Sequence, residues 1–135
     1  MPSEIAPPVL QLGQPYLDLH DTVAEAEQAA AQRPQDRFFD ASGRPLRRAA
    51  AQDGDRLQHD GEAPAEAEVL AGVREVIDAA RPHANAGQAD LKSEDLDQLE
   101  PVLAAGRAAD VIETLGMPAP GGAGDKIGKV IKSIF

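Results

Sequence analysis

The stretch YLDLHDTVAE, residues 16–25, decides the fold, because a strand pattern passes directly into a helix start within it. Leu17 and Leu19 alternate with polar residues, which is typical of a strand with one buried face. Thr22 and Glu25 then form a capping box, in which the threonine hydroxyl accepts a backbone N–H of the first helical turn. A strand that leads straight into a helix predicts a fold that mixes both elements.

Further short strands are predicted on both sides of this stretch. The Ala-rich helix that begins after Thr22 is expected to stop near Arg33, because Pro34 follows. An Asp-Gly pair at residues 53–54 favours a hairpin turn between two of the later strands. The strand candidates are residues 9–12, 16–20, 37–40, 45–48 and 56–59. Together they predict a small, mainly antiparallel sheet built on a β-α-β-β order.

From Pro64 onward the apolar period changes to that of a helix. Pro82 is expected to end this first helix. Residues 93–106 predict a short helix that Pro101 divides in two, and residues 107–115 predict another. The apolar positions of the first helix are Val69, Leu70, Val73, Val76 and Ile77. The C-terminal half is therefore predicted to be helical.

These patterns predict the layout of the chain. Residues 1–8 carry three prolines and are expected to be disordered. Residues 9–116 are expected to form a single two-layer α+β domain with its helices on one side of the sheet. Residues 117–124 contain two prolines and three glycines, so we expect a linker there. Residues 125–135 are expected to be a separate cationic amphipathic tail, tethered by that linker.

Composition excludes several classes of function. The net charge of −10 argues against nucleic-acid binding and favours a solubilising surface or a partner with a basic face. The chain has no cysteine, which excludes disulfides and thiolate chemistry. The N-terminal residues lack the basic and apolar regions of a signal peptide, so we expect a cytoplasmic location, with leaderless export as the alternative.

The segment DKIGKVIKSIF, residues 125–135, differs in composition from the rest of the chain. It holds three of the four lysines and sums to +2 in side-chain charge, which leaves −12 for the other residues. On a helix, its apolar side chains fill one arc and its lysines the opposite arc. The apolar arc consists of Ile127, Val130, Ile131, Ile134 and Phe135, and the cationic arc contains Lys126, Lys129 and Lys132.

Three ways of covering this apolar arc stay open, because eleven residues are too few for a stable isolated helix. The tail folds back onto its own domain, with help from opposite charge. Alternatively, it docks as a helix in a groove of a partner protein. In the third case it lies on a membrane surface, although an acidic body is repelled by anionic lipid.

The leading hypothesis is a non-catalytic adaptor, chaperone or inhibitor-type protein that binds another protein through the eight tail residues named above. One alternative is a membrane-associated or membrane-active protein that uses the same tail. Another is an acidic, immunity-type inhibitor that covers a basic site with its body. The oligomeric state is left open.

Motifs for catalysis or metal binding are not found. The three histidines are far apart and lack the spacing of metal ligands, and no phosphate-binding loop or nucleophile motif is present. Asp18, Asp21 and Asp40 are the carboxylates that converging strand ends would bring together for acid–base chemistry; the alternative is a solvated rim. The sequence therefore predicts a protein without enzymatic activity, metal or cofactor.

Overall fold

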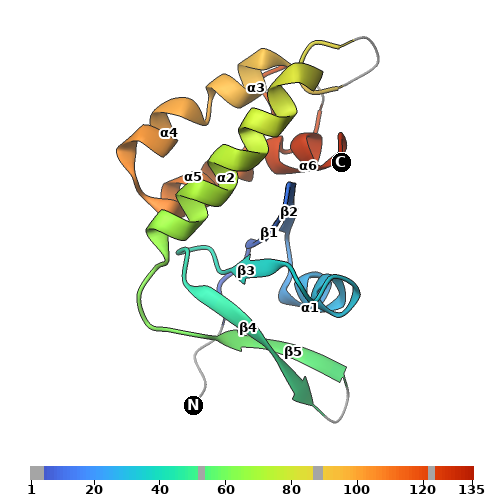
Figure 1. Cartoon of the computed structure of the whole chain (residues 1–135), viewed down its shortest axis with the longest axis vertical. Helices are drawn as coiled ribbons and strands as arrows, with labels where there is room; N and C mark the ends of the chain where they lie inside the picture. Colours follow the sequence, from blue (N-terminus) through green and yellow to red (C-terminus); the bar gives the residue numbers. More distant parts are fainter. Residues whose placement is uncertain (1–4, 52–53, 87–89, 122–123) are drawn as a thin grey trace.

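The computed structural model describes residues 5–51, 54–86, 90–121 and 124–135. Five strands form one sheet in the order β2-β1-β3-β4-β5, and every neighbouring pair is antiparallel (Figure 1). The strands are β1 Val9–Gly13, β2 Tyr16–His20, β3 Arg37–Phe39, β4 Pro45–Ala51 and β5 Gly54–His59. The mainly antiparallel sheet and the α+β class are confirmed. The predicted β-α-β-β unit corresponds to β2, α1, β3 and β4, with β1 before it and β5 after it.

Helix α1, Val23–Gln32, begins where the capping box predicts. The Thr22 hydroxyl accepts the backbone N–H of Glu25 at 3.2 Å, and Arg33 is the C-cap ahead of Pro34. Its buried residues are Ala26 and Ala30, whose small side chains bring the helix close to the sheet.

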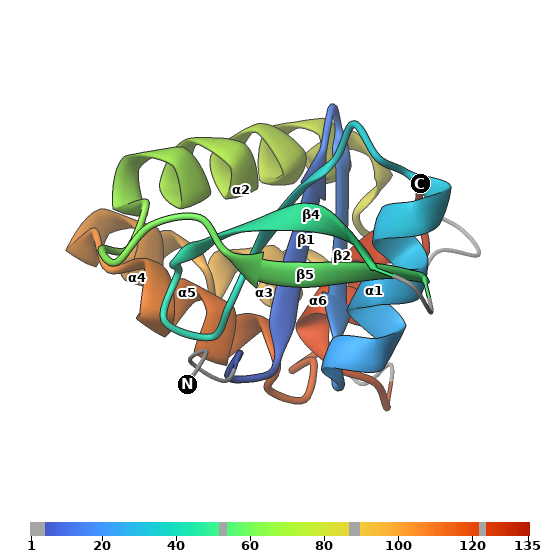
Figure 2. The same ribbon diagram turned by 90° about the horizontal axis from the view of Figure 1, so that it is seen from below.

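The sheet has an apolar core on each face, because successive side chains of a strand point to opposite sides. One core contains Leu10, Leu12, Leu17, Leu19 and Phe39 together with the helices of the C-terminal half. The other contains Val9, Phe38, Leu46 and Leu57 together with Ala26 and Ala30 of α1. Helices therefore cover both faces, with α1 on one side of the strands and the other helices across from it (Figures 1 and 2). The expectation of two layers, with all helices on one side, is wrong.

The helical half follows the predicted boundaries closely. It consists of α2 Glu66–Ala80, the short 3-10 helix η1 Arg81–His83, α3 Ser93–Asp97, α4 Glu100–Ala105 and α5 Ala108–Leu115. Pro82 lies in η1, just past the end of α2, and Pro101 lies in the first turn of α4, where the missing N–H costs nothing. Gly106 ends α4 with a φ of 80°, a left-handed conformation that suits glycine.

Residues 5–8 contact the domain. The Ala6 carbonyl accepts the backbone N–H of Ala41 at 2.9 Å, and Ile5 packs against the core that contains α1. Disorder was predicted for all of residues 1–8, but residues 1–4 lie outside the described residues. The observed contacts extend the sheet domain on its N-terminal side.

An ion-pair cluster joins α2 to α4. The two terminal nitrogens of Arg74, Nη1 and Nη2, donate to the Glu100 carboxylate at 2.8 Å, and Arg81 donates to it at 2.6 Å. The hydrogen bonds from Arg74 and then from Arg81 lower the pKa of Glu100 from 4.5 to about 2. A bidentate pair of this kind fixes the crossing of the two helices.

Replacing Glu100 by glutamine is expected to lower the free energy of unfolding by about 1 kcal/mol at pH 7, since solvent screens this half-exposed cluster. A carboxylate whose pKa is lower in the folded state stabilises the fold above its unfolded pKa and loses that effect as the pH falls. The difference between the wild type and Glu100→Gln should therefore shrink between pH 4.5 and about 2. Urea unfolding at a series of pH values measures it, and a difference that does not change with pH would contradict the assignment.

Candidate functional site

The tail forms a short helix, α6 Ile127–Lys132, that packs on its own domain. It lies against β2 and α5, and it belongs to the larger apolar core. Ile127, Val130 and Ile131 retain only 1%, 3% and 0% of their exposure. Of the three coverings that the sequence leaves open, the structure therefore has the intramolecular one.

A glycine brings α6 close to the sheet. A Cβ atom at Gly128 would lie 3.2 Å from Cβ of Leu19 and 3.3 Å from the Leu115 carbonyl oxygen. Any larger side chain would push the helix away from both neighbours. Gly128 therefore faces β2 and α5 at close range.

The segment predicted as a linker is fastened at several points. Pro118 and Lys126 form an antiparallel bridge, and the Ala119 N–H donates to the Asp125 carbonyl at 2.9 Å. The buried carboxylate of Asp95 accepts the Gly121 N–H at 2.7 Å. Residues 122 and 123 of the predicted linker lie outside the described residues. The hydrogen-bonded segments before and after these two residues keep the chain on the domain, and the second of them leads into α6.

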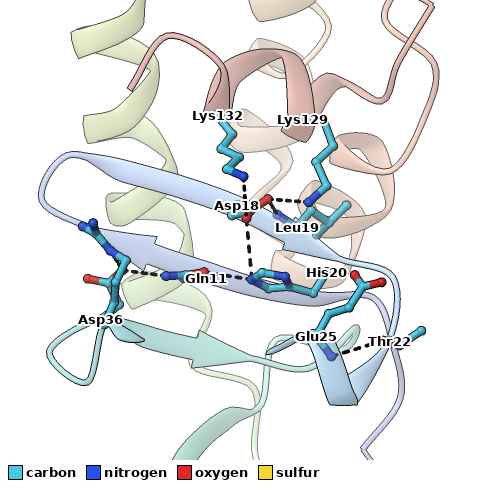
Figure 3. A network of polar contacts seen from close by, with 10 residues as sticks. Gln11, Asp18, Leu19, His20, Thr22, Glu25, Asp36, Lys129 and Lys132 are labelled. Atoms are coloured by element: carbon cyan, nitrogen blue, oxygen red, sulfur yellow. Dashed lines mark hydrogen bonds and ion pairs between the residues drawn. The ribbon is translucent and has the colours of Figure 1, made fainter. Parts of the chain in front are cut away.

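The three tail lysines hold the helix to the edge strand, and we call these contacts the lysine clasp. Lys129 Nζ donates to Asp18 at 2.7 Å, and Lys132 Nζ lies 3.5 Å from the other oxygen of Asp18. Lys126 donates to Asp21, and this hydrogen bond lowers the pKa of the Asp21 carboxyl. Figure 3 shows Lys129 and Lys132 both reaching from α6 to Asp18. The clasp therefore uses the lysines intramolecularly.

Asp18 belongs to the face of β2 that looks toward α1, and a polar network continues from it. His20 Nε2 lies 2.8 Å from Gln11 Oε1, and the Gln11 amide donates to Asp36 at 2.7 Å (Figure 3). Because the Gln11 oxygen can only accept, Nε2 of His20 carries the proton. Burial lowers the pKa of His20, so its ring is neutral. Gln11, Asp18 and His20 are all buried, so this network is a satisfied part of the fold.

The carboxylates considered for acid–base chemistry do not converge. Asp18 and Asp21 bind the tail lysines, whereas Asp40 accepts the Ser42 hydroxyl at 2.7 Å and His59 Nε2 at 2.9 Å. Burial alone would raise the pKa of Asp40, but hydrogen bonds from Ser42, His59 and two backbone N–H groups together lower it. In this cluster the aspartate sits between the serine and the histidine, so the histidine is not placed to activate the hydroxyl.

The structure separates the eight predicted tail residues into three groups. Ile127, Val130 and Ile131 are core residues, and the three lysines form the clasp. Ile134 is half-buried against the core, and Phe135 is 44% exposed. Phe135 and Met117 are the exposed large apolar side chains of the described residues. Sequence reasoning missed Met117, since it lies in a segment whose composition predicted a linker.

The helical half carries most of the negative charge. Residues 62–116 hold twelve Asp and Glu against four Lys and Arg, a net charge of −8. Within the described part of that range the exposed acids are Glu62, Glu66, Glu68, Glu75, Asp78, Asp90, Glu94, Asp97, Asp110 and Glu113. Arg81 pairs with Asp97 as well as with Glu100, and Arg37 pairs with Glu68, so part of this charge is neutralised locally. The exposed surface of the helical half is therefore acidic overall.

No protein-family model, curated protein or solved structure is significantly similar to this chain. Among the described residues there is no group of three or more His, Cys, Asp or Glu side chains that is arranged to hold a metal ion. Over the same residues, no helix combines the length and the apolar character that crossing a bilayer requires.

Proposed function

We propose that the protein is a non-catalytic, inhibitor-type binding protein that covers a basic site of a partner with the acidic face of its helical layer. The observation that carries this proposal is the concentration of exposed carboxylates on residues 62–116, with a net charge of −8. Complementary charge speeds encounter with a basic partner and disfavours acidic ones. The tail supports this choice over docking through α6, because the lysine clasp and the buried isoleucines occupy it internally.

The test is a capture experiment with the full chain and native lysate of the source organism at low salt. Reversing four exposed acids of the helical layer is expected to weaken binding of a captured basic partner about tenfold, because the net charge of residues 62–116 then rises from −8 to 0 and the attraction is lost. The variant carries Glu75→Lys, Asp78→Lys, Asp110→Lys and Glu113→Lys. An Asp60→Lys variant, altered at an exposed position after β5, is the control for position; it changes the net charge by +2, against +8 for the fourfold variant. Capture that is equally strong with the reversed chain would contradict the proposal.

A second candidate is favoured by the exposure of Phe135 and the partial exposure of Ile134. In this reading the end of the tail binds a partner protein or a membrane surface. Phe135→Ser separates the candidates, because it should then abolish capture of the partner protein or co-sedimentation with anionic liposomes, whereas binding through the acidic helical layer would be unchanged. This substitution leaves the buried face of α6 intact, so a loss of binding would not reflect unfolding.

A further inference from the structure

A shallow groove with a mixed apolar and polar lining lies between α4 and α5. Its volume is about 340 Å³. It is lined by Pro101, Val102, Ala105, Asp110, Glu113, Thr114 and Met117. The large apolar residues of α5, which include Val111, Ile112 and Leu115, point inward to the core, so the groove is on the outer side of the layer.

Met117 forms one wall from a fixed backbone. Its N–H donates to the Thr114 carbonyl and its carbonyl accepts the Ile127 N–H, each at 3.0 Å. The second bond comes from the first residue of α6, so the packed tail holds this wall in place. Met117 is 46% exposed, and its flexible side chain can adapt to an apolar group of a ligand. Because its backbone is already fixed, binding there would cost little further backbone entropy.

The polar groups of the groove are of two kinds: a threonine hydroxyl that is already hydrogen-bonded within α5, and two exposed carboxylates at the rim. The Thr114 hydroxyl donates to the Asp110 carbonyl at 2.8 Å, which leaves the floor apolar in effect. Asp110 and Glu113 are exposed on the rim, and neither has an ion-pair partner in the described part of the chain. An apolar floor beside two unpaired carboxylates is complementary to a segment with one apolar side and one cationic side.

We propose that this groove binds a short, cationic amphipathic helix of the partner protein. An apolar side chain of that helix packs against Met117 and Val102, and its Lys or Arg side chains approach Asp110 and Glu113. The inference deepens the proposed function and rests on it, since it assigns the acidic face a specific contact point and the partner a specific chemistry.

The direct test titrates the full chain with a synthetic Leu/Lys amphipathic peptide of about 14 residues that carries one Trp on its apolar face. The chain has no Trp, so peptide fluorescence reports binding, and amide shifts map the contact. We expect shifts concentrated on α4, α5 and Met117. The double reversal Asp110→Lys with Glu113→Lys should weaken binding about tenfold, and Met117→Ser should weaken it about fivefold.

The matched control is Glu75→Lys with Asp78→Lys, which makes the same charge change on α2. It should weaken peptide binding less than about threefold, through the screened field alone. Three outcomes would overturn the inference. Both pairs weaken binding equally, the amide shifts spread over the whole acidic surface, or a peptide with the same residues in scrambled order binds equally well. It would also be overturned if the Met117 signal shifts with protein concentration alone, because a second copy would then cover the groove. Urea midpoints confirm that each variant is folded.

The same two pairs separate failure of this inference from failure of the proposed function. If the natural partner responds to the α2 pair and not to the groove pair, the acidic face binds the partner elsewhere and only the groove assignment fails. If neither pair nor the fourfold variant changes capture, the proposed function fails as well, and the groove assignment falls with it.

Discussion

Replacing Ile131 by alanine is expected to lower the free energy of unfolding by about 3 kcal/mol, a large share of the stability of a domain of this size. Ile131 has no exposed surface and belongs to the larger core together with side chains of the sheet. The substitution leaves a cavity in that core, and α6 has little room to shift into it, since even a Cβ atom at Gly128 would lie 3.2 Å from Leu19 and 3.3 Å from Leu115. Urea unfolding followed by circular dichroism measures the change.

Phe135→Ala is the matched control, because it removes a larger apolar side chain from the same tail at an exposed position. It should change the free energy of unfolding by less than about 1 kcal/mol. If both substitutions have the same small effect, the tail is a detachable appendage and not part of the core. A chain that ends at Gly116 should then also be as stable as the wild type, whereas the structure implies a strong loss.

The tail shows what periodicity predicts and what it leaves open. The spacing of Ile127, Val130 and Ile131 identifies which side of the helix is apolar, and that side is buried. The spacing does not indicate what covers that side, because a helix that packs in a groove of another protein has the same pattern as one that packs on its own sheet. The contrast between a tail of +2 and a body of −12 was the available signal for the intramolecular answer. Asp18 and Asp21 are the acidic residues of the body that pair with the tail lysines.

The third layer was missed for a similar reason. Phe38 and Phe39 are neighbours in β3, so they point to opposite faces, and both are buried. Two adjacent large apolar residues in a strand indicate that both faces of a sheet are covered. The Ala-rich helix α1 could have been assigned to the second face from that pair. Its Ala-rich apolar side predicts close packing on a sheet but does not by itself indicate which face it covers.

The groove could not be predicted from the sequence, because its parts come from separate segments. Met117 follows α5 and stands at the start of a Pro/Gly-rich stretch, which composition alone assigns to a linker. Its position depends on a hydrogen bond from Ile127, and that bond exists only because the tail returns to the domain. A contact between segments of this kind is visible in three dimensions and has no periodic signature.

Replacing Lys129 by methionine is expected to lower the free energy of unfolding by about 2 kcal/mol at pH 7. Methionine keeps the apolar stem and the helix propensity, so the change removes the charge and the hydrogen bond. Asp18, with a side chain only 5% exposed, would then be a buried carboxylate that keeps the Leu19 N–H at 2.8 Å and a more distant Lys132. A buried charge that loses its closest partner is far more costly than a surface charge.

Lys126→Met is the matched control within the same clasp. Its partner Asp21 is 54% exposed, so water replaces the lost ion pair and the free energy of unfolding should fall by less than about 0.5 kcal/mol. Asp18→Asn combined with Lys129→Met should recover part of the loss, because the buried charge is then absent. Equal losses for the two lysine variants, or no recovery in the double variant, would show that the clasp is no stronger than an ordinary surface pair. The tail would then be held mainly by its buried apolar side chains, Ile127, Val130 and Ile131, together with its backbone hydrogen bonds.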